Sequence, residues 1–327
     1  MKRFLLTLAA VVLGGNINAQ KVMPDAPFGW ATCTSLEKGG HYDLTGGNPA
    51  KTVILQSNGL DMREDIIKSV KDYDVIVFDG SCGDFIVSSS MRFSGLRDKT
   101  FLGINGARLK TQFEVTPELT KLLDDAGVKQ MSDQGDGGKL SNGAFVYEER
   151  EQHTRQAIID YTGDQKEIYR NSGIFNMLDC RNIIIRNIAF EGPGPIDVGG
   201  ADLLTLSRGS EHIWVDHCSF TDGMDGNFDI NSKSDFITVS WCTFSYTDKA
   251  YDHKASNLIA SSERPDQGED NLNITYAYCV WGNGCEVRMP AVRWGRIHLL
   301  NNLYDCAGNS EERPERRAKS RKGNTKV

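Results

Sequence analysis

A nine-residue pattern recurs five times between residues 182 and 304, and it constrains the fold more than any other feature of the sequence. Each copy has Ile at its second position, an aliphatic residue or Tyr at its fourth and an aromatic residue at its ninth. Successive copies start 30, 24, 37 and 23 residues apart, so the shorter intervals fit one turn of a stacked coil and the longer ones a turn with an insertion. The repeat therefore predicts a β-solenoid. The copies begin at Asn182, His212, Phe236, Asn273 and Arg296.

Apolar residues alternate within the copies, as Ile213 and Val215 do in the second one. This period of two is that of a β-strand, so we expect the copies to stack as strands in register. The seventh position holds cysteine in three successive copies, namely Cys218, Cys242 and Cys279. We expect these thiols to form a ladder of small buried residues inside the coil.

The first 19 residues have the pattern of a cleavable secretory signal. Lys2 and Arg3 precede an apolar run from Phe4 to Leu13, and the small residue Ala19 precedes the expected cleavage point. No other segment is long and apolar enough to span a bilayer. We therefore expect a soluble mature chain, secreted to the extracellular space or the periplasm. In that compartment disulfides are allowed, and Cys33 with Cys82 is the weakly favoured pair.

The chain carries a formal net charge of −7, which argues against a nucleic-acid partner. Its last residues differ from the rest, because residues 311–327 contain seven Lys and Arg against three Glu. A short basic tail of this kind is usually solvated, and we expect residues 307–327 to be disordered and assign them no function.

The segments before the repeats suggest a covered solenoid with one long excursion. Residues 61–73 place Ile66, Ile67 and Val70 on one helical face, which predicts a helix that covers the N-terminal end of the solenoid. Residues 75–80 and 100–106 look like strands of the first coils. The pattern lapses between residues 112 and 170, where residues 117–126 predict a helix and the remaining loops are expected to face a substrate.

Three aspartates lie in two successive repeats. Asp225 and Asp229 flank residues 226–228, and Asp202 lies one repeat earlier. Stacked coils would bring the three carboxylates to one side of adjacent turns, where oxygen ligands with flexible geometry suit Ca²⁺. Spacing alone also fits a scatter of exposed aspartates on turns.

A second cluster contains two arginines, Arg288 and Arg293, with Pro290 fixing the backbone between them. Two guanidinium groups near an acidic metal site would form a pocket for an anionic ligand that a cation bridges. The alternative is a pair of surface arginines bound to acidic residues.

Four ordered motifs resemble those of the pectate lyases of polysaccharide lyase family 1, and the likeness runs from about residue 29 to residue 306. The resemblance implies an all-β fold, a right-handed parallel β-helix with a helical N-terminal cap and loop insertions. It also implies a secreted enzyme that cleaves homogalacturonan by Ca²⁺-dependent β-elimination. The motifs are Trp-Val-Asp-His at 214–217, Asp-Gly-Asn-Phe-Asp at 225–229, Ile-Thr-Val-Ser-Trp at 237–241 and Arg-Met-Pro-Ala-Val-Arg at 288–293.

The resemblance also assigns site residues. The calcium carboxylates of the family fall on Asp202, Asp225 and Asp229, the catalytic arginine on Arg288 and the substrate-binding arginine on Arg293. A further motif residue, His217, looks like a packed and hydrogen-bonded histidine rather than a catalyst. Its neighbour Asp216 belongs to the same structural motif.

The substrate-binding lysine of the family has two candidates. A count without gaps from Asp229 through the following strand places it at Lys249. A count back from Leu258-Ile-Ala, which resembles a Leu-Ile-Gly motif of the family, places it nearer Lys254. We favour Lys249 from sequence, because the register of a strand is harder to shift than a loop.

The implied chemistry explains why these residue types would be needed. The proton on C5 of a galacturonate lies next to a carboxylate, and it becomes acidic only if the charge of that carboxylate is neutralised. A free substrate carboxylate is required for this, so we expect de-esterified polygalacturonate to be the substrate. Two alternatives are a non-catalytic Ca²⁺-dependent solenoid that binds acidic polysaccharides and a β-helix pectin hydrolase, which would need a paired acid and base.

The resemblance stops before the end of the chain. Family members continue past Asn301 and Asn302 with further coils, whereas here Cys306 is followed by the basic run to Val327. We expect one domain over residues 20–306, a monomer, that lacks the last coils. An open last coil would lower its stability and promote association at the edge.

Overall fold

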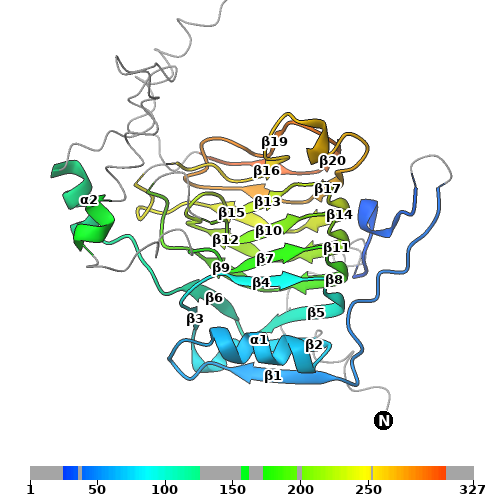
Figure 1. Cartoon of the computed structure of the whole chain (residues 1–327), viewed down its shortest axis with the longest axis horizontal. Helices are drawn as coiled ribbons and strands as arrows, with labels where there is room; N and C mark the ends of the chain where they lie inside the picture. The colour runs from blue at the N-terminus through cyan, green and yellow to red at the C-terminus, as the bar shows by residue number, and fades with distance from the viewer. Residues whose placement is uncertain are drawn as a thin grey trace, which may run out of the picture.

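The computed structural model describes residues 25–35, 39–125, 156–161, 172–196, 201–251 and 253–306. In these ranges the chain winds into three parallel sheets of eight, six and seven strands. The strand order in each sheet follows the order of the chain, and each turn of the coil from β2 to β19 adds one strand to each sheet (Figure 1). The expected right-handed parallel β-helix is thus confirmed, with its outermost strands β1 and β20 at opposite ends (Figure 1). The predicted signal segment and basic tail lie outside the described residues.

The eight-stranded sheet contains most of the regularly alternating sequence. Its strands are β1 (Thr52–Gln56), β2 (Val75–Asp79), β5 (Arg97–Ile104), β8 (Arg181–Arg186), β11 (Glu211–Asp216), β14 (Asp235–Ser240), β17 (Asn273–Ala277) and β20 (Arg296–Leu300).

The other two sheets are built from shorter strands. The six-stranded sheet contains β4 (Met91–Ser94), β7 (Phe175–Leu178), β10 (Leu204–Ser207), β13 (Phe228–Ile230), β16 (Leu258–Ile259) and β19 (Ala291–Val292). The seven-stranded sheet contains β3 (Phe85–Val87), β6 (Arg108–Thr111), β9 (Ala189–Glu191), β12 (Ser219–Thr221), β15 (Thr243–Ser245), β18 (Val280–Trp281) and β21 (Leu303–Tyr304).

Each nine-residue copy contains a corner between two strands rather than one strand. The sixth residue of the copy has a positive φ, from 49° to 59° in the five copies, and this left-handed residue turns the chain from the eight-stranded to the seven-stranded sheet. In the second copy Ile213 and Val215 face inward before the corner, and Cys218 and Phe220 face inward after it. The corner residues are Asn187, His217, Trp241, Tyr278 and Asn301.

The core is a set of side-chain stacks that run along the coil. The ninth positions form an aromatic stack in which Phe190 and Phe220 have ring centroids 4.9 Å apart, followed by Phe244, Trp281 and Tyr304. Such offset stacks add stabilisation beyond the burial of apolar area. Trp281 is fully buried, whereas Tyr304 in the last described coil is 48% exposed because no described coil covers it.

The cysteine ladder is confirmed. Cys218, Cys242 and Cys279 are buried, and each thiol donates to one carbonyl of its own coil and one of the preceding coil. The expected disulfide is wrong, because Cys33 and Cys82 are both free thiols. Cys33 follows a 3-10 helix (Gly29–Thr32) that packs on β14 and β17, whereas Cys82 lies several coils away, just after β2.

Two described helices flank the coil. The helix α1 (Arg63–Asp72) buries Ile66 and Val70 against the core and lies across the end of the solenoid beside β1 (Figure 1), as expected of an N-terminal cap. The helix α2 (Pro117–Asp125) lies to one side of the sheets (Figure 1), and the hydroxyl oxygen of Thr116 accepts a hydrogen bond from the N–H of Leu119 at its start. None of the described helices combines the length and apolarity that crossing a membrane requires.

A second, smaller core joins α2 to the loops beside the six-stranded sheet. Leu119 and Leu123 of α2 pack with residues that include Ile196 and Met224. Met224 directly precedes Asp225, so this small core fixes the loop that carries one of the predicted ligands. The excursion thus supports one corner of the coil.

Candidate functional site

The predicted acidic and basic residues come together where the loops after the seven-stranded sheet enter the six-stranded sheet. Asp202 precedes β10, Asp229 lies within β13, and Arg288 and Arg293 flank β19. Because β10, β13, β16 and β19 are successive neighbours in one sheet, residues far apart in sequence share one edge. The structure therefore brings five of the seven predicted residues, Asp225 included, to one corner.

The carboxylates of this corner repel one another in a buried setting. Burial, together with the charges of Asp229 and Asp225, raises the pKa of Asp202 well above its usual value. Burial and the charge of Asp225 likewise raise the pKa of Asp229 to about 7, although its Oδ1 accepts a hydrogen bond of 2.8 Å from the N–H of Leu258. The cluster thus has more negative charge than its protein neighbours compensate.

One carboxylate oxygen is left without a partner. Oδ2 of Asp202 accepts a hydrogen bond from the hydroxyl of Thr205, but the buried Oδ1 has no hydrogen-bond partner among the described residues. A Cβ added to Gly226 would lie 2.8 Å from this atom and 3.2 Å from Oδ1 of Asp229. Two carboxylate oxygens thus flank a space that only glycine leaves open.

The donor set suits a hard cation, although it does not form a finished coordination sphere. Within the described part of the chain, no three His, Cys, Asp or Glu side chains are already close enough to hold a metal ion. An unpartnered buried carboxylate oxygen and raised carboxyl pKa values are what a site built for Ca²⁺ shows before its ligands close on the ion. The residues present therefore fit a calcium ion, given a small inward movement of the carboxylates.

His253, which belongs to no recognised sequence motif, contacts the aspartate Asp225. The side chain of His253 is only 2% exposed, and its Nε2 lies 3.1 Å from Oδ1 of Asp225. The contact depends on the fold of the loop between β15 and β16, so no motif in the sequence could reveal it.

The two arginines differ in their contacts. Arg288 forms no ion pair with the described acidic residues, yet its positive charge lowers the pKa of both Asp202 and Asp229, which places it beside the cluster. Its backbone has a φ of 58°, a left-handed conformation that costs a non-glycine residue free energy and is common at functional sites. Arg293 donates to the carbonyl oxygens of Ala260 and Ser261.

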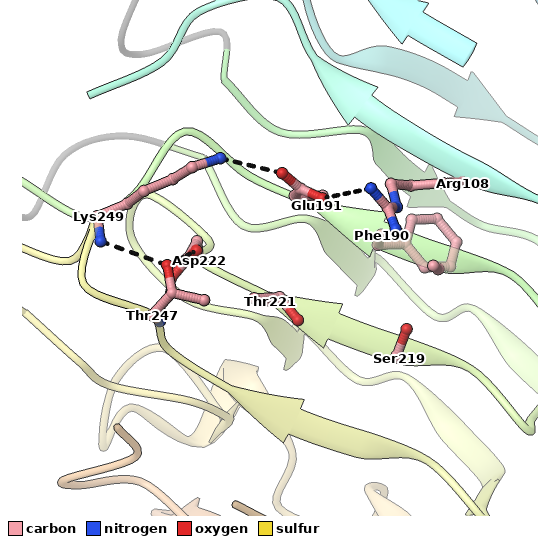
Figure 2. Close-up of a pocket in the computed structure, with 9 residues that line it drawn as sticks. Arg108, Phe190, Glu191, Ser219, Thr221, Asp222, Thr247 and Lys249 are labelled. Carbon is pink, nitrogen blue, oxygen red and sulfur yellow. Dashed lines mark hydrogen bonds and ion pairs between the residues drawn. The ribbon is translucent and has the colours of Figure 1, made fainter. Parts of the chain in front are cut away.

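The two candidate lysines lie in different surroundings. Lys249 binds Oε1 of Glu191 at 3.0 Å in a separate pocket of about 220 Å³ on the seven-stranded sheet. Figure 2 shows that Arg108 contacts the same carboxylate from the other side. Lys254 instead runs beside the segment that leads to Arg288, because its carbonyl oxygen accepts hydrogen bonds from the N–H groups of residues 286 and 287. The amino group of Lys254 lies 3.6 Å from Oε1 of Glu286.

The Trp-Val-Asp-His motif lies in a different sheet from these residues. Asp216 at the end of β11 is fully buried and binds the side chains of Arg186, Ser240 and His217. The ring of His217 stacks on that of Trp241 with centroids 5.9 Å apart. These contacts fit the structural role that the sequence suggested for the motif, although the side chain of His217 is 43% exposed.

Comparison with known proteins points to one family. Residues 152–311 match the family described as pectate lyase. The chain is 40% identical over 133 residues to a pectate trisaccharide-lyase of Thermotoga maritima, an alignment that covers 38% of this chain and 34% of the relative. It is 29% identical over 163 residues to the pectate lyase of Bacillus subtilis, with 41% and 37% of the two chains covered.

Solved structures of the same kind are also similar. A pectate lyase of a Bacillus species in complex with trigalacturonate matches with a TM-score of 0.46 and 15% identity, covering 85% of this chain and 68% of that one. The chain spans about a third of the length of the two Thermotoga relatives that it matches. Over residues 152–311 the chain is therefore similar to the pectate lyases, of the polysaccharide lyase family 1 type.

Proposed function

We propose that the protein is a calcium-dependent pectate lyase that cleaves de-esterified polygalacturonate by β-elimination and releases 4,5-unsaturated oligogalacturonates. The observation that carries the proposal is the position of Arg288, a guanidinium without an acidic partner among the described residues, beside a buried and uncompensated carboxylate cluster. The names of the relatives, pectate lyase and pectate trisaccharide-lyase, support the same reaction.

Asp202, Asp225 and Asp229 would hold the calcium ion. When bound, Ca²⁺ neutralises the galacturonate carboxylate and so makes the neighbouring C5 proton more acidic. The three aspartates would gain at the same time, because a divalent cation between them removes the repulsion that raises the pKa values of Asp202 and Asp229. Binding of the ion and of the anionic substrate would therefore favour each other.

Arg288 would accept the C5 proton. The electron pair of the broken C–H bond forms the C4–C5 double bond, and the glycosidic oxygen leaves from C4, so no water is consumed. A guanidinium is normally protonated, so it must first give up a proton to solvent before it can accept the one on C5. An alkaline pH optimum is the expected consequence.

Arg293 and a lysine would bind the carboxylates of neighbouring sugar units. Arg293 already points a donor toward the carbonyl oxygens of Ala260 and Ser261, and the planar guanidinium has further N–H groups for an anion. For the lysine the geometry favours Lys254, which lies along the segment of Arg288, over Lys249, which is engaged by Glu191. We infer that the amino group of Lys254 moves from Glu286 to the substrate.

Secretion and a monomeric state complete the proposal. The basic and apolar pattern of residues 1–19 supports export, and the net charge of −7 argues against a nucleic-acid partner.

The reaction type is tested by the mass and absorbance of the products. Purified protein would be incubated with polygalacturonate at alkaline pH, with Ca²⁺ and with a chelator. The proposal predicts products that absorb in the ultraviolet and are lighter by one water than hydrolysis products, formed only with Ca²⁺. Saturated products of full mass would establish a hydrolase instead, and equal rates in chelator would refute the role of calcium.

A further inference from the structure

The loop between β15 and β16 aims one histidine at the acidic cluster. The imidazole of His253 is almost completely buried, and its Nε2 lies 3.1 Å from Oδ1 of Asp225, an ion-pair contact without the alignment of a hydrogen bond. The side chain of Asp225 is 33% accessible, and it has no other ion pair among the described residues.

The backbone holds the histidine in an unusual conformation. His253 has a φ of 52°, in the left-handed region that a residue with a Cβ rarely adopts. Its carbonyl oxygen accepts a hydrogen bond of 2.7 Å from the N–H of Ala255. The carbonyl oxygen of Ala255 in turn accepts a bond of 2.9 Å from the buried hydroxyl of Tyr246. These bonds hold the loop on the C-terminal side of His253.

We propose that His253 is a positioning residue for the cation site, which acts by holding Oδ1 of Asp225 so that Oδ2 stays available to the ion. The inference rests on the proposed calcium site at Asp202, Asp225 and Asp229. On binding of the ion, a small rotation of the imidazole would align this contact as a hydrogen bond, and groups that hold a metal ligand in this way fix its orientation; their removal typically weakens metal binding about 10- to 100-fold. His253 does not itself bind the ion.

Calcium binding without substrate tests the inference, measured by isothermal titration calorimetry on the full chain and on His253→Asn and His253→Gln. Asparagine tolerates a positive φ, so it keeps the turn, but its shorter side chain does not reach Asp225. Glutamine can place a donor nitrogen near the position of Nε2. We expect binding about 10- to 100-fold weaker with asparagine and mostly restored with glutamine.

A double-mutant cycle separates positioning from a general effect on the fold. If His253 acts through Asp225, then His253→Asn should cause no further loss of calcium affinity in an Asp225→Asn background. Thermal melts in chelator check that each variant is folded, and His253→Gly, which tolerates the positive φ and removes the imidazole, carries the comparison if the asparagine variant is not.

The outcomes distinguish this inference from the function on which it rests. Absence of calcium binding by the wild-type protein would overturn the calcium site and this inference with it. Tight binding by both the wild-type protein and His253→Asn would overturn the role of His253 and leave the calcium site intact. An equal further loss in the Asp225→Asn background would also overturn it, because the histidine would then act by another route.

Discussion

Replacement of Asp229 by asparagine should stabilise the protein in the absence of calcium. The side chain is buried, its carboxylate is repelled by Asp225, and its pKa is raised from 3.8 to about 7. The raised pKa means that the folded state disfavours the ionised carboxylate, so the cost is absent below pH 3.8 and complete once the pH exceeds about 7. Asparagine carries no charge, and its side-chain oxygen can still accept the hydrogen bond from the N–H of Leu258.

The size of the effect follows from the change in pKa. A difference between 3.8 and about 7 corresponds to about 4 kcal/mol of destabilisation above pH 7. Relaxation around the carboxylate lowers this value, so we expect Asp229→Asn to gain about 2 to 4 kcal/mol at pH 8. At about 2 °C per kcal/mol for a chain of this size, the Tm should rise by about 4 to 8 °C. At pH 4.5 the gain should fall to about 1 kcal/mol or less.

Calorimetric melts in chelator at pH 8 and pH 4.5 measure this difference. The exposed Asp43→Asn is a matched control that removes the same charge without a buried cluster, and its Tm should change little. A Tm for Asp229→Asn at or below that of the wild-type protein at pH 8 would refute the reasoning. A gain that is equally large at pH 4.5 would refute the electrostatic cause. With Ca²⁺ added, the wild-type protein and Asp43→Asn should become more stable, and Asp229→Asn should not.

Three further expectations concern substrate binding, the cation and the N-terminal segment. In steady-state assays, Lys254→Ala should lower kcat/KM on polygalacturonate about 10- to 100-fold, whereas Lys249→Ala should change it less than about threefold. A larger loss of kcat/KM in Lys249→Ala than in Lys254→Ala would assign the substrate contact to Lys249. Gly226→Ala should abolish calcium binding in calorimetric titrations, because its Cβ would lie 2.8 Å from Oδ1 of Asp202; unchanged affinity would place the ion elsewhere. Burial lowers the pKa of His212, so the free energy of unfolding measured in urea should fall as the pH drops below about 6.5. His212→Phe should remove that part of the pH dependence, and the same pH profile in the variant and the wild-type protein would contradict this expectation.

The solenoid could be predicted from the sequence because inward positions repeat in every coil. Within a copy, inward Ile213 and Val215 are followed by inward Cys218 and Phe220, so the inward positions shift from odd to even numbers. This shift is present in the sequence, but the corner that causes it is not evident there, because the chain turns at a single residue with a positive φ. Most residue types occur there, including His217 and Trp241.

The site was only partly predictable, because it lies on the sheet with the weakest sequence signal. Strands such as β13 and β16 are two or three residues long, and the loops between the sheets differ in length from coil to coil. The choice of Lys249 over Lys254 rests on the register of a strand and stays a prediction. In the structure, the residues after β15 place Lys249 beside Glu191 and His253 beside Asp225. Such contacts arise from loop geometry, which the sequence pattern does not encode.

The most direct test of the account is the initial rate of unsaturated product formation from polygalacturonate by the wild-type protein and by Arg288→Ala, at saturating Ca²⁺. The exposed Arg264→Ala, whose guanidinium binds Asp266 on the surface, serves as the matched control. Loss of the group that accepts the proton should lower kcat by about 10²- to 10⁴-fold, while the variant stays folded and still binds calcium. A folded Arg288→Ala variant that cleaves the polymer at the wild-type rate, or a wild-type protein that binds the polymer without cleaving it, would contradict the account.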